Sequence, residues 1–257
     1  MTRPSTLRYR LAAAAAAVLL GSAVLTAPAA DKLPKAKTPK KKTPATMPGP
    51  DRPFNGKNLD GWVTKQHRKS KSQWTVGSAR LSEAKPKEFA VSPKGSEMIN
   101  AKGHGVDIYS KYVHGDAVIK LEVMVPKGSN SGVYVHGEYE IQVLDSYGRD
   151  KNPGRSDMGA LYGAAPPNKP KYKKPGEWQT FEIHFMAPKF DAKGKKIANA
   201  RFVKILLNGG VIHENVEMKG PTPGGVDRKE KPKGPIMFQG NHGVVAYRNI
   251  EVTPLKK

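Results

Sequence analysis

The sequence of 257 residues contains no cysteine, and this absence excludes several kinds of site at once. Without cysteine there is no disulfide bond, no thiolate metal ligand, no cysteine nucleophile and no lipid-modified N-terminal cysteine. An exported protein of this composition depends on its packed core alone for stability.

Sustained helical periodicity is also lacking after the N-terminus, and so are the G-x-G-x-x-G and phosphate-loop motifs. Aromatic residues make up only 7% and hydrophobic residues 37% of the chain, which allows a core but not a rich one. The 26 glycines and 22 prolines indicate many turns and loops. This composition is typical of an all-β domain with long loops.

Acidic residues are scarce, because 22 Asp and Glu stand against 44 Lys and Arg, for a net charge of +22. Ten of the basic residues precede Phe54, yet the remainder of the chain is still basic. Such an excess favours contact with anionic polymers. The lysines of the domain are scattered, without interleaved aromatic residues or a nucleic-acid motif, so we expect no specific nucleic-acid partner.

Residues 1–29 have the organisation of a secretory signal peptide. An alanine-rich apolar run from Leu11 to Leu25 follows three arginines, and Ala27-Pro28-Ala29 fits a cleavage site. The run is short for a spanning helix, so we expect export to the periplasm or the medium and no transmembrane span after cleavage. Residues 30–53, rich in lysine and proline, are predicted to be a disordered basic linker that could contact an anionic envelope polymer.

Residues 54–257 are predicted to form one domain of antiparallel strands. Ala117 to Val125 alternates between apolar and other side chains, as a half-buried strand does. Trp74–Val76 and Ala79–Leu81 are predicted to be two strands joined by a Gly-Ser turn. The long stretch from Ser146 to Gly176 is predicted to be a loop.

The stretch from Gly128 to Asp145 predicts a hairpin with one apolar and one polar face. Residues two apart in a strand share a face, and one parity here is polar: Tyr134, His136, Glu138, Glu140 and Gln142. A solvated sheet face alternates in the same way, but this stretch contains no lysine although the chain is rich in it. We therefore expect a groove for a hydroxyl-rich ligand, provided that Gly137 does not break the register.

Seven short motifs in the same order resemble the 3-keto-disaccharide hydrolase domain family, over about residues 54 to 254. They are Phe54-Asn55-Gly56-Lys57 with Leu59 and Gly61-Trp62, Asn130-Ser131-Gly132-Val133-Tyr134, Tyr139 to Asp145, Gly159 to Gly163, Gly176 to Gln179, Leu207-Asn208-Gly209, and Gly234 to Ile250. The resemblance implies a concanavalin A-like jelly-roll sandwich of two antiparallel sheets with a ligand groove. Gln179 and Phe238 depart from the residues usual in the family, and the departure near His136, where a basic residue is common, could alter substrate preference.

The resemblance also implies cleavage of glycosides that already carry a ketone at carbon 3 of the sugar. The ketone acidifies the hydrogen on carbon 2, so that a base removes it, the enolate expels the glycosidic oxygen and water adds back. Glu140 or Glu138 would be the base, and His136, Tyr134 or Gln142 would stabilise the oxyanion. An ordinary glycosidase with Glu138 and Glu140 as its carboxylate pair stays open as an alternative.

Further side chains are expected to bind the carbohydrate substrate around these carboxylates: Asn130, Tyr134, Gln142, Asp145, Tyr162, Gln239 and His242. The apolar segment from Met158 to Gly163 is expected at the groove edge. No cofactor is expected, and a calcium ion at Asp145 has no motif to support it. Asp145 could instead cap a loop, and His242 could serve a positive-φ position.

Two other functions are compatible with the same residues. A jelly roll of this class can be a non-catalytic, lectin-like carbohydrate-binding module, because fold alone does not decide function. The second alternative is a basic envelope protein that binds anionic polymers. Turnover of oxidised and unoxidised disaccharides would separate an enzyme from both.

Overall fold

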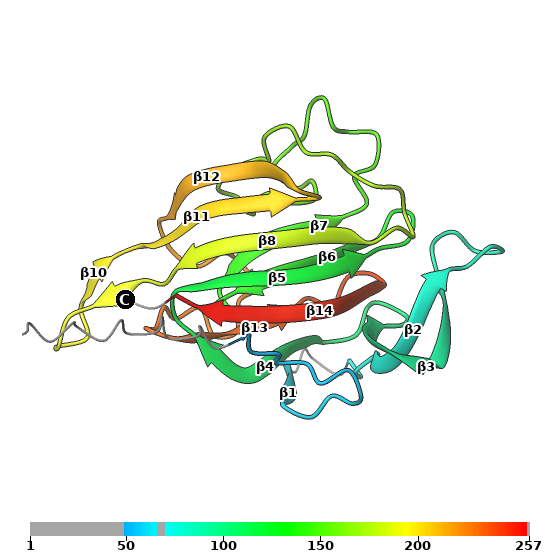
Figure 1. Cartoon of the computed structure of the whole chain (residues 1–257), viewed down its shortest axis with the longest axis horizontal. Coiled ribbons are helices and arrows are strands. Elements are labelled where there is room, and N and C mark those ends of the chain that lie inside the picture. Colours follow the sequence, from blue (N-terminus) through cyan, green and yellow to red (C-terminus); the bar gives the residue numbers. More distant parts are fainter. Residues whose placement is uncertain (1–48, 66–69, 256–257) are drawn as a thin grey trace, which may run out of the picture. The chain divides into compact units, whose positions relative to one another are not determined.

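The computed structural model describes residues 49–65 and 70–255, and these residues form an antiparallel β-sandwich in which none is helical. Figure 1 shows the two large sheets as layers, the larger one toward the viewer. The strands are β1 (Trp62–Lys65), β2 (Trp74–Leu81), β3 (Phe89–Asn100), β4 (Asp107–His114), β5 (Ala117–Met124), β6 (Asn130–Val135), β7 (Tyr139–Leu144), β8 (Gln179–Met186), β9 (Lys189–Phe190), β10 (Lys196–Ala198), β11 (Ala200–Leu207), β12 (Gly210–Met218), β13 (Gly234–Phe238) and β14 (Val245–Pro254).

The smaller sheet has the strand order β1-β4-β13-β6-β7, and the larger has β12-β11-β8-β5-β14-β3-β2. All pairings are antiparallel, so the predicted all-β, jelly-roll sandwich is confirmed. The last two strands of the chain enter the middle of the sheets, β13 between β4 and β6, and β14 between β5 and β3. Each sheet is therefore complete only when the C-terminal part of the chain has joined it.

The core lies between the sheets and is built from alternating apolar side chains. In β7, Tyr139, Ile141 and Val143 have no exposed surface, as the apolar parity of the hairpin predicts. Phe238 of the smaller sheet stacks between Trp62 and Tyr247, with ring centroids 5.4 and 3.9 Å away. Because Tyr247 belongs to the larger sheet, this stack of aromatic rings joins the two layers.

The sandwich begins before the predicted boundary at Phe54. The backbone of Asp51 exchanges two 2.8 Å hydrogen bonds with Val252 of β14, and the indole of Trp62 donates to the carbonyl of Pro53. The predicted signal peptide and most of the predicted linker lie outside the described residues. Within residues 49–65 and 70–255, no helix has the length and apolarity needed to cross a membrane.

The region predicted as two short strands around Gly77-Ser78 is a single strand, β2, with a bulge at that position. A Cβ atom on Gly77 would lie 2.2 Å from the carbonyl oxygen of Ser92, so the bulge depends on glycine for the close approach of β3. The glycine that suggested a turn therefore serves a strand irregularity instead.

Candidate active site

The outer face of the smaller sheet carries two neighbouring rows of side chains across four strands. The register sets the first row as Tyr109, Met237, Tyr134 and Glu140. The second row lies two residues further along each strand and consists of Asp107, Gln239, Gly132 and Gln142. The same register sets it, together with the hydrogen bond from the backbone amide of Gln239 to the carbonyl of Gly132. Polar side chains from strands far apart in the sequence thus meet on one surface.

Five residues of these rows line a cavity of about 290 Å³: Asp107, Tyr134, Glu140, Gln142 and Gln239. Seven of the ten predicted site residues line it: Asn130, Tyr134, Glu140, Gln142, Tyr162, Gln239 and His242. Five further lining residues were not predicted: Lys65, Asp107, Pro223, Gly224 and Asn241. Hydroxyl, amide, carboxylate and ammonium groups surround one space, which suits a ligand rich in hydroxyl groups.

Glu140 is the most strongly perturbed carboxylate of the cavity. Its side chain is only 4% exposed, and no lysine or arginine among the described residues forms an ion pair with it. Burial raises the pKa of Glu140 to about 7, the negative charge of Asp107 adds to the increase, and the Tyr134 hydroxyl opposes it. A carboxylate with this pKa exchanges protons near neutral pH, which is the requirement for a general base.

Asp107 is the second carboxylate of the cavity, and the sequence analysis missed it. It begins β4, is 5% exposed, and its Oδ1 accepts a 2.9 Å hydrogen bond from the amide of Gly240. This bond fixes the carboxylate beside Glu140 without neutralising it. In the sequence Asp107 is the first residue of a predicted short strand, Asp107-Ile108-Tyr109-Ser110, and belongs to no polar parity set, so no local signal marks it.

The wall opposite the sheet is formed by the loop of residues 219–233 between β12 and β13, called the wall loop here, with Pro223 and Gly224 at the cavity. The hydroxyl of Tyr134 donates a 3.0 Å hydrogen bond to the carbonyl of Pro223. The Lys65 ammonium donates to the carbonyls of Gly224 and Gly225 at 2.6 and 2.5 Å. Sequence patterns show this loop only as a proline- and glycine-rich connection, so its place in the site could not be predicted from them.

Glu138 lies outside the cavity, contrary to the prediction that it could be the base. Its carboxylate is 3% exposed and accepts 3.0 Å hydrogen bonds from the amides of Asp227 and Arg228. Burial raises its pKa, and the two amide bonds act against the increase. Glu138 therefore holds the wall loop in place, and it does not form a carboxylate pair with Glu140 in the groove.

His136 also lies outside the cavity, and the predicted oxyanion role does not fit its position. The hairpin turn starts at this residue, since His136 and Gly137 have φ of 59° and 74°. The left-handed backbone turns the imidazole into the core, 5.6 Å from the ring of Phe185 and 5.8 Å from that of His114. Burial, with His114 as a smaller cause, lowers the pKa of His136 to about 4.

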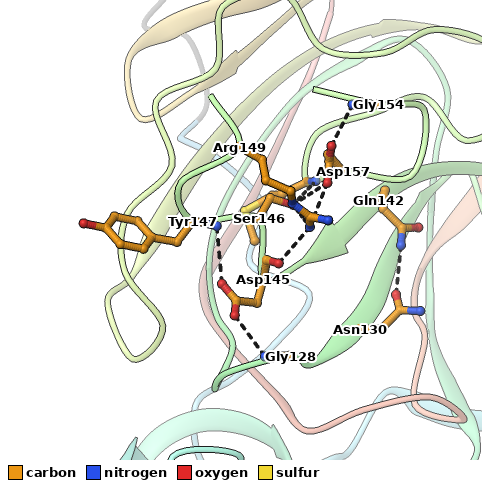
Figure 2. A network of polar contacts seen from close by, with 10 residues as sticks. Gly128, Asn130, Gln142, Asp145, Ser146, Tyr147, Arg149, Gly154 and Asp157 are labelled. Atoms are coloured by element: carbon orange, nitrogen blue, oxygen red, sulfur yellow. Dashed lines mark hydrogen bonds and ion pairs between the residues drawn. The ribbon is translucent and has the colours of Figure 1, made fainter. Parts of the chain in front are cut away.

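Asp145 is a turn residue and does not reach the cavity. Figure 2 shows its carboxylate directed at the amides of Gly128 and Tyr147, 2.9 and 3.4 Å away. The same figure shows the separate pair that belongs to the cavity, in which the Gln142 amide donates to Asn130 Oδ1 at 2.8 Å. Asp145 therefore caps a loop, as one of its two predicted roles requires, and it does not line the cavity in which substrate binding was predicted.

The segment from Met158 to Gly163 forms the groove edge, as predicted. Its backbone pairs with the free edge of β7, where the Gly159 amide donates to Gln142 and the Tyr162 amide donates to Glu140. These bonds are 2.8 and 3.1 Å long. They place the phenol of Tyr162 over the cavity beside Glu140.

Among residues 49–65 and 70–255, no group of three or more His, Asp or Glu side chains is arranged to hold a metal ion. The cavity combines a carboxylate of raised pKa with hydrogen-bond donors, and such a set can in principle remove a proton next to a carbonyl group.

Comparison with known proteins identifies the family of this chain. The 3-keto-alpha-glucoside-1,2-lyase-like domain matches residues 49–253. The chain belongs to this family. Among curated proteins, none matches the chain significantly.

Three crystal structures of candidate glycosyl hydrolases from Parabacteroides distasonis are similar to this member of the family. The first is 26% identical, with a TM-score of 0.58 over 80% of this chain and 84% of the other. The second is 16% identical, with a TM-score of 0.54 over 81% and 94%. The third is 23% identical, with a TM-score of 0.50 over 79% and 98%. The two less similar structures show the shared sandwich fold alone.

Proposed function

We propose that this chain cleaves glycosides that carry a ketone at carbon 3 of the sugar, with Glu140 as the base. The observation that carries the proposal is a single buried carboxylate with a pKa of about 7, set in a cavity of hydrogen-bonding groups. Membership of a 3-keto-alpha-glucoside-1,2-lyase-like family supports the substrate class.

The first step transfers the hydrogen on carbon 2 of the sugar, as a proton, to the Glu140 carboxylate. The electron pair left on carbon 2 delocalises into the ketone and forms an enolate. When the enolate collapses, a double bond forms between carbons 1 and 2 and the bond from carbon 1 to the glycosidic oxygen breaks. The leaving oxygen takes a proton from the Glu140 carboxylic acid, so the base is regenerated.

A second step returns the sugar to its hydrated form. Water adds across the new double bond, with its hydroxyl on carbon 1 and its hydrogen on carbon 2. The sum of the two steps is hydrolysis of the glycosidic bond, while the first step alone is elimination. Product analysis distinguishes an enzyme that stops after elimination from one that completes both.

The enolate oxygen needs a donor that is already in position. The side-chain amides of Gln239 and Gln142 qualify, because each has two N–H groups. The Tyr134 hydroxyl has one donor hydrogen, so it qualifies only when it turns away from the Pro223 carbonyl. The Lys65 ammonium, held by two carbonyls at the wall, adds a positive charge at the same side of the cavity. The interactions of these groups with the ketone oxygen become stronger as negative charge develops on that oxygen, and this lowers the free-energy barrier for proton removal.

The mechanism of an ordinary glycosidase can be distinguished from the proposed elimination by its substrate. It would need two carboxylates as acid and nucleophile or base. Since Glu138 is bound to the wall loop, the only second carboxylate at the cavity among the described residues is Asp107. Such an enzyme would cleave an unoxidised glycoside, whereas elimination requires the ketone.

The decisive experiment is the release of glucose derivatives from 3-keto-sucrose, compared with sucrose itself. We expect turnover of the ketone only, and Glu140→Gln should reduce kcat by roughly 10²–10⁴-fold while substrate still binds. Glu83→Gln, on an exposed loop, is the matched control and should retain activity. Wild-type protein that binds both sugars and releases no product would show a lectin-like module instead.

We also propose that the protein is exported and that its basic linker contacts an anionic envelope polymer. The support is the order of basic, apolar and small residues in 1–29 and the lysines of 30–48. N-terminal sequencing of the mature protein from cell fractions tests the first part. A mature protein that still begins with Met1 in the cytoplasm would contradict export.

A further inference from the structure

A second cavity, of about 500 Å³, lies next to the candidate active site. The two cavities share three lining residues: Asn130, Asn241 and His242. A substrate larger than one sugar ring can therefore extend from Glu140 past these side chains. The second cavity is called the basic cleft here because of four lining residues: Lys87, Lys102, His104 and Lys127.

The positive charge of the basic cleft is not neutralised by the described residues. The side chains of Lys87, Lys102 and Lys127 are exposed, and none forms an ion pair with a described residue. Glu88 is the only acidic residue in the lining, and it pairs with Lys85 at 3.3 Å. Three unpaired ammonium groups around one hollow attract an anion and discriminate against a cation.

The walls of the basic cleft are rigidly joined. Asn100, which is fully buried, donates to the carbonyls of Gly240 and Gly243 at 2.9 and 2.8 Å. Ser129 donates to the carbonyl of Val244 at 2.6 Å. A Cβ atom on Gly243 would lie 2.3 Å from Ser129 Oγ, so the two loops are in direct contact. The loops that carry the lysines are joined by backbone hydrogen bonds as well, from the Lys127 amide to the Pro86 carbonyl at 2.9 Å and from the His104 amide to the His242 carbonyl at 3.3 Å.

We propose that the basic cleft binds an anionic group on the leaving part of the substrate. The oxidised sugar ring occupies the cavity at Glu140, and the leaving group extends past Asn241 and His242 to the lysines. The preferred substrates are then 3-keto-glycosides whose leaving group carries a carboxylate or a phosphate. This inference rests on the proposed function, and it adds the chemical class of the leaving group.

The test uses three synthetic 3-keto-α-glucosides with the same phenyl leaving group, substituted at the meta position. One carries a carboxylate, one a phosphate monoester and one a neutral carboxamide. We expect wild-type kcat/KM for either anion to exceed that for the amide by about tenfold at low salt, with the preference shrinking as salt rises. The ratio between carboxylate and phosphate shows which anion fits better.

The variant Lys87→Gln/Lys102→Gln/Lys127→Gln should abolish the anion-to-amide ratio, mainly through a higher KM for the anions. Its control is Lys111→Gln/Lys193→Gln/Lys195→Gln, which removes the same charge from exposed positions on β4 and the β9–β10 hairpin. The control should keep the wild-type ratio. Equal loss of the ratio in both variants would mean that net charge alone produces the preference, and it would overturn the proposal.

Failure of the inference and failure of the proposed function give different results. If the wild-type protein cleaves all three probes at equal kcat/KM, the proposed binding of anions by the basic cleft is overturned, while the proposed function stands. If no probe is cleaved, the proposed function fails. Titration calorimetry with the same carboxylate and amide probes then tests whether the basic cleft prefers to bind the anion. Equal binding of both probes, or binding unaffected by the three lysine substitutions, would then overturn the inference.

Discussion

The side chain of Glu140 lies directly over Gly132 of the neighbouring strand. A Cβ atom on Gly132 would be 2.4 Å from Glu140 Oε1 and 3.1 Å from its carboxyl carbon. Tyr134, two residues along β6, stands opposite Glu140 in the strand register. The base is therefore held in a space that exists because one residue of the second row has no side chain.

Gly132→Ala should reduce kcat by at least tenfold, because the new methyl group displaces the carboxylate by about an ångström from its position. Turnover of a 3-keto-glucoside and thermal unfolding should be measured together. Gly220→Ala, where no heavy atom lies within 4 Å of the added Cβ, is the control and should leave turnover unchanged. Full activity of the Gly132 variant would show that the position of Glu140 tolerates this shift.

The pH dependence of kcat/KM should have an acidic limb near pH 7, because the base must lose its proton and the pKa of Glu140 is about 7. Asp107→Asn removes a negative charge that raises this pKa. The substitution keeps Oδ1 as the acceptor for the Gly240 amide. We expect the limb to move to lower pH in the variant, by about half a unit to one unit. A limb that stays in place would exclude Asp107 as a cause.

Much of the fold follows from the sequence, because alternation and turn residues are local signals. The strands β5, β6 and β7 fall where period-two patterns place them, and their apolar parity is buried. β3 was missed, since its middle contains serine, proline, lysine and glycine and is exposed. Its pairing with β2 depends on a bulge at Gly77, which looks like a turn in sequence.

In the candidate site, too, local patterns place some residues and miss others. Glu140 and Gln142 could be placed because they lie inside one regular strand. His136 and Glu138 could not be placed, because the backbone turns at His136 with a positive φ and the alternation of side chains between two faces stops there. Asp107 and Lys65 reach the site through long-range pairing, which one segment read alone does not encode.

Glu140→Gln should also raise the stability of the protein above neutral pH. The pKa of Glu140 is raised from 4.5 to about 7, so between these values the folded state binds more protons than the unfolded state. Stability contributed by this group is therefore lost as pH rises through the window, and the cost persists above pH 7. Removing the charge should gain roughly 1–3 kcal/mol at pH 8 and much less at pH 5. Urea unfolding at both pH values measures this, and an equal change at both would contradict it.

Glu138 should behave as a structural residue. Glu138→Ala leaves the amides of Asp227 and Arg228 without their acceptor, at a cost of about 1–3 kcal/mol in the free energy of unfolding. Glu138→Gln keeps one acceptor oxygen and should retain kcat within about tenfold. Chemical unfolding and turnover of a 3-keto-glucoside are measured on both variants. If Glu138→Gln instead lost activity as severely as Glu140→Gln, its assignment to the wall loop would be insufficient.

Binding of polyanions should depend on the linker and not on the sandwich. Six lysines lie between Lys32 and Lys42, in a stretch where Leu33 and Ala36 are the only apolar residues besides proline, whereas most lysines of the sandwich are spread over its loops. Contacts of this kind release counterions, so the affinity should fall steeply with salt.

The comparison is between residues 30–257 and residues 49–257, because Asp51 and Pro53 bind the sandwich and must be kept. On immobilised heparin, the longer form should elute at clearly higher salt, and changing the six lysines to glutamine in it should give the elution of the shorter form. Turnover of a 3-keto-glucoside should be the same in all three proteins, because the catalytic groups lie between Lys65 and His242. Tight retention of the shorter form would locate the polyanion site on the sandwich, most simply at the basic cleft, and would contradict the assignment to the linker.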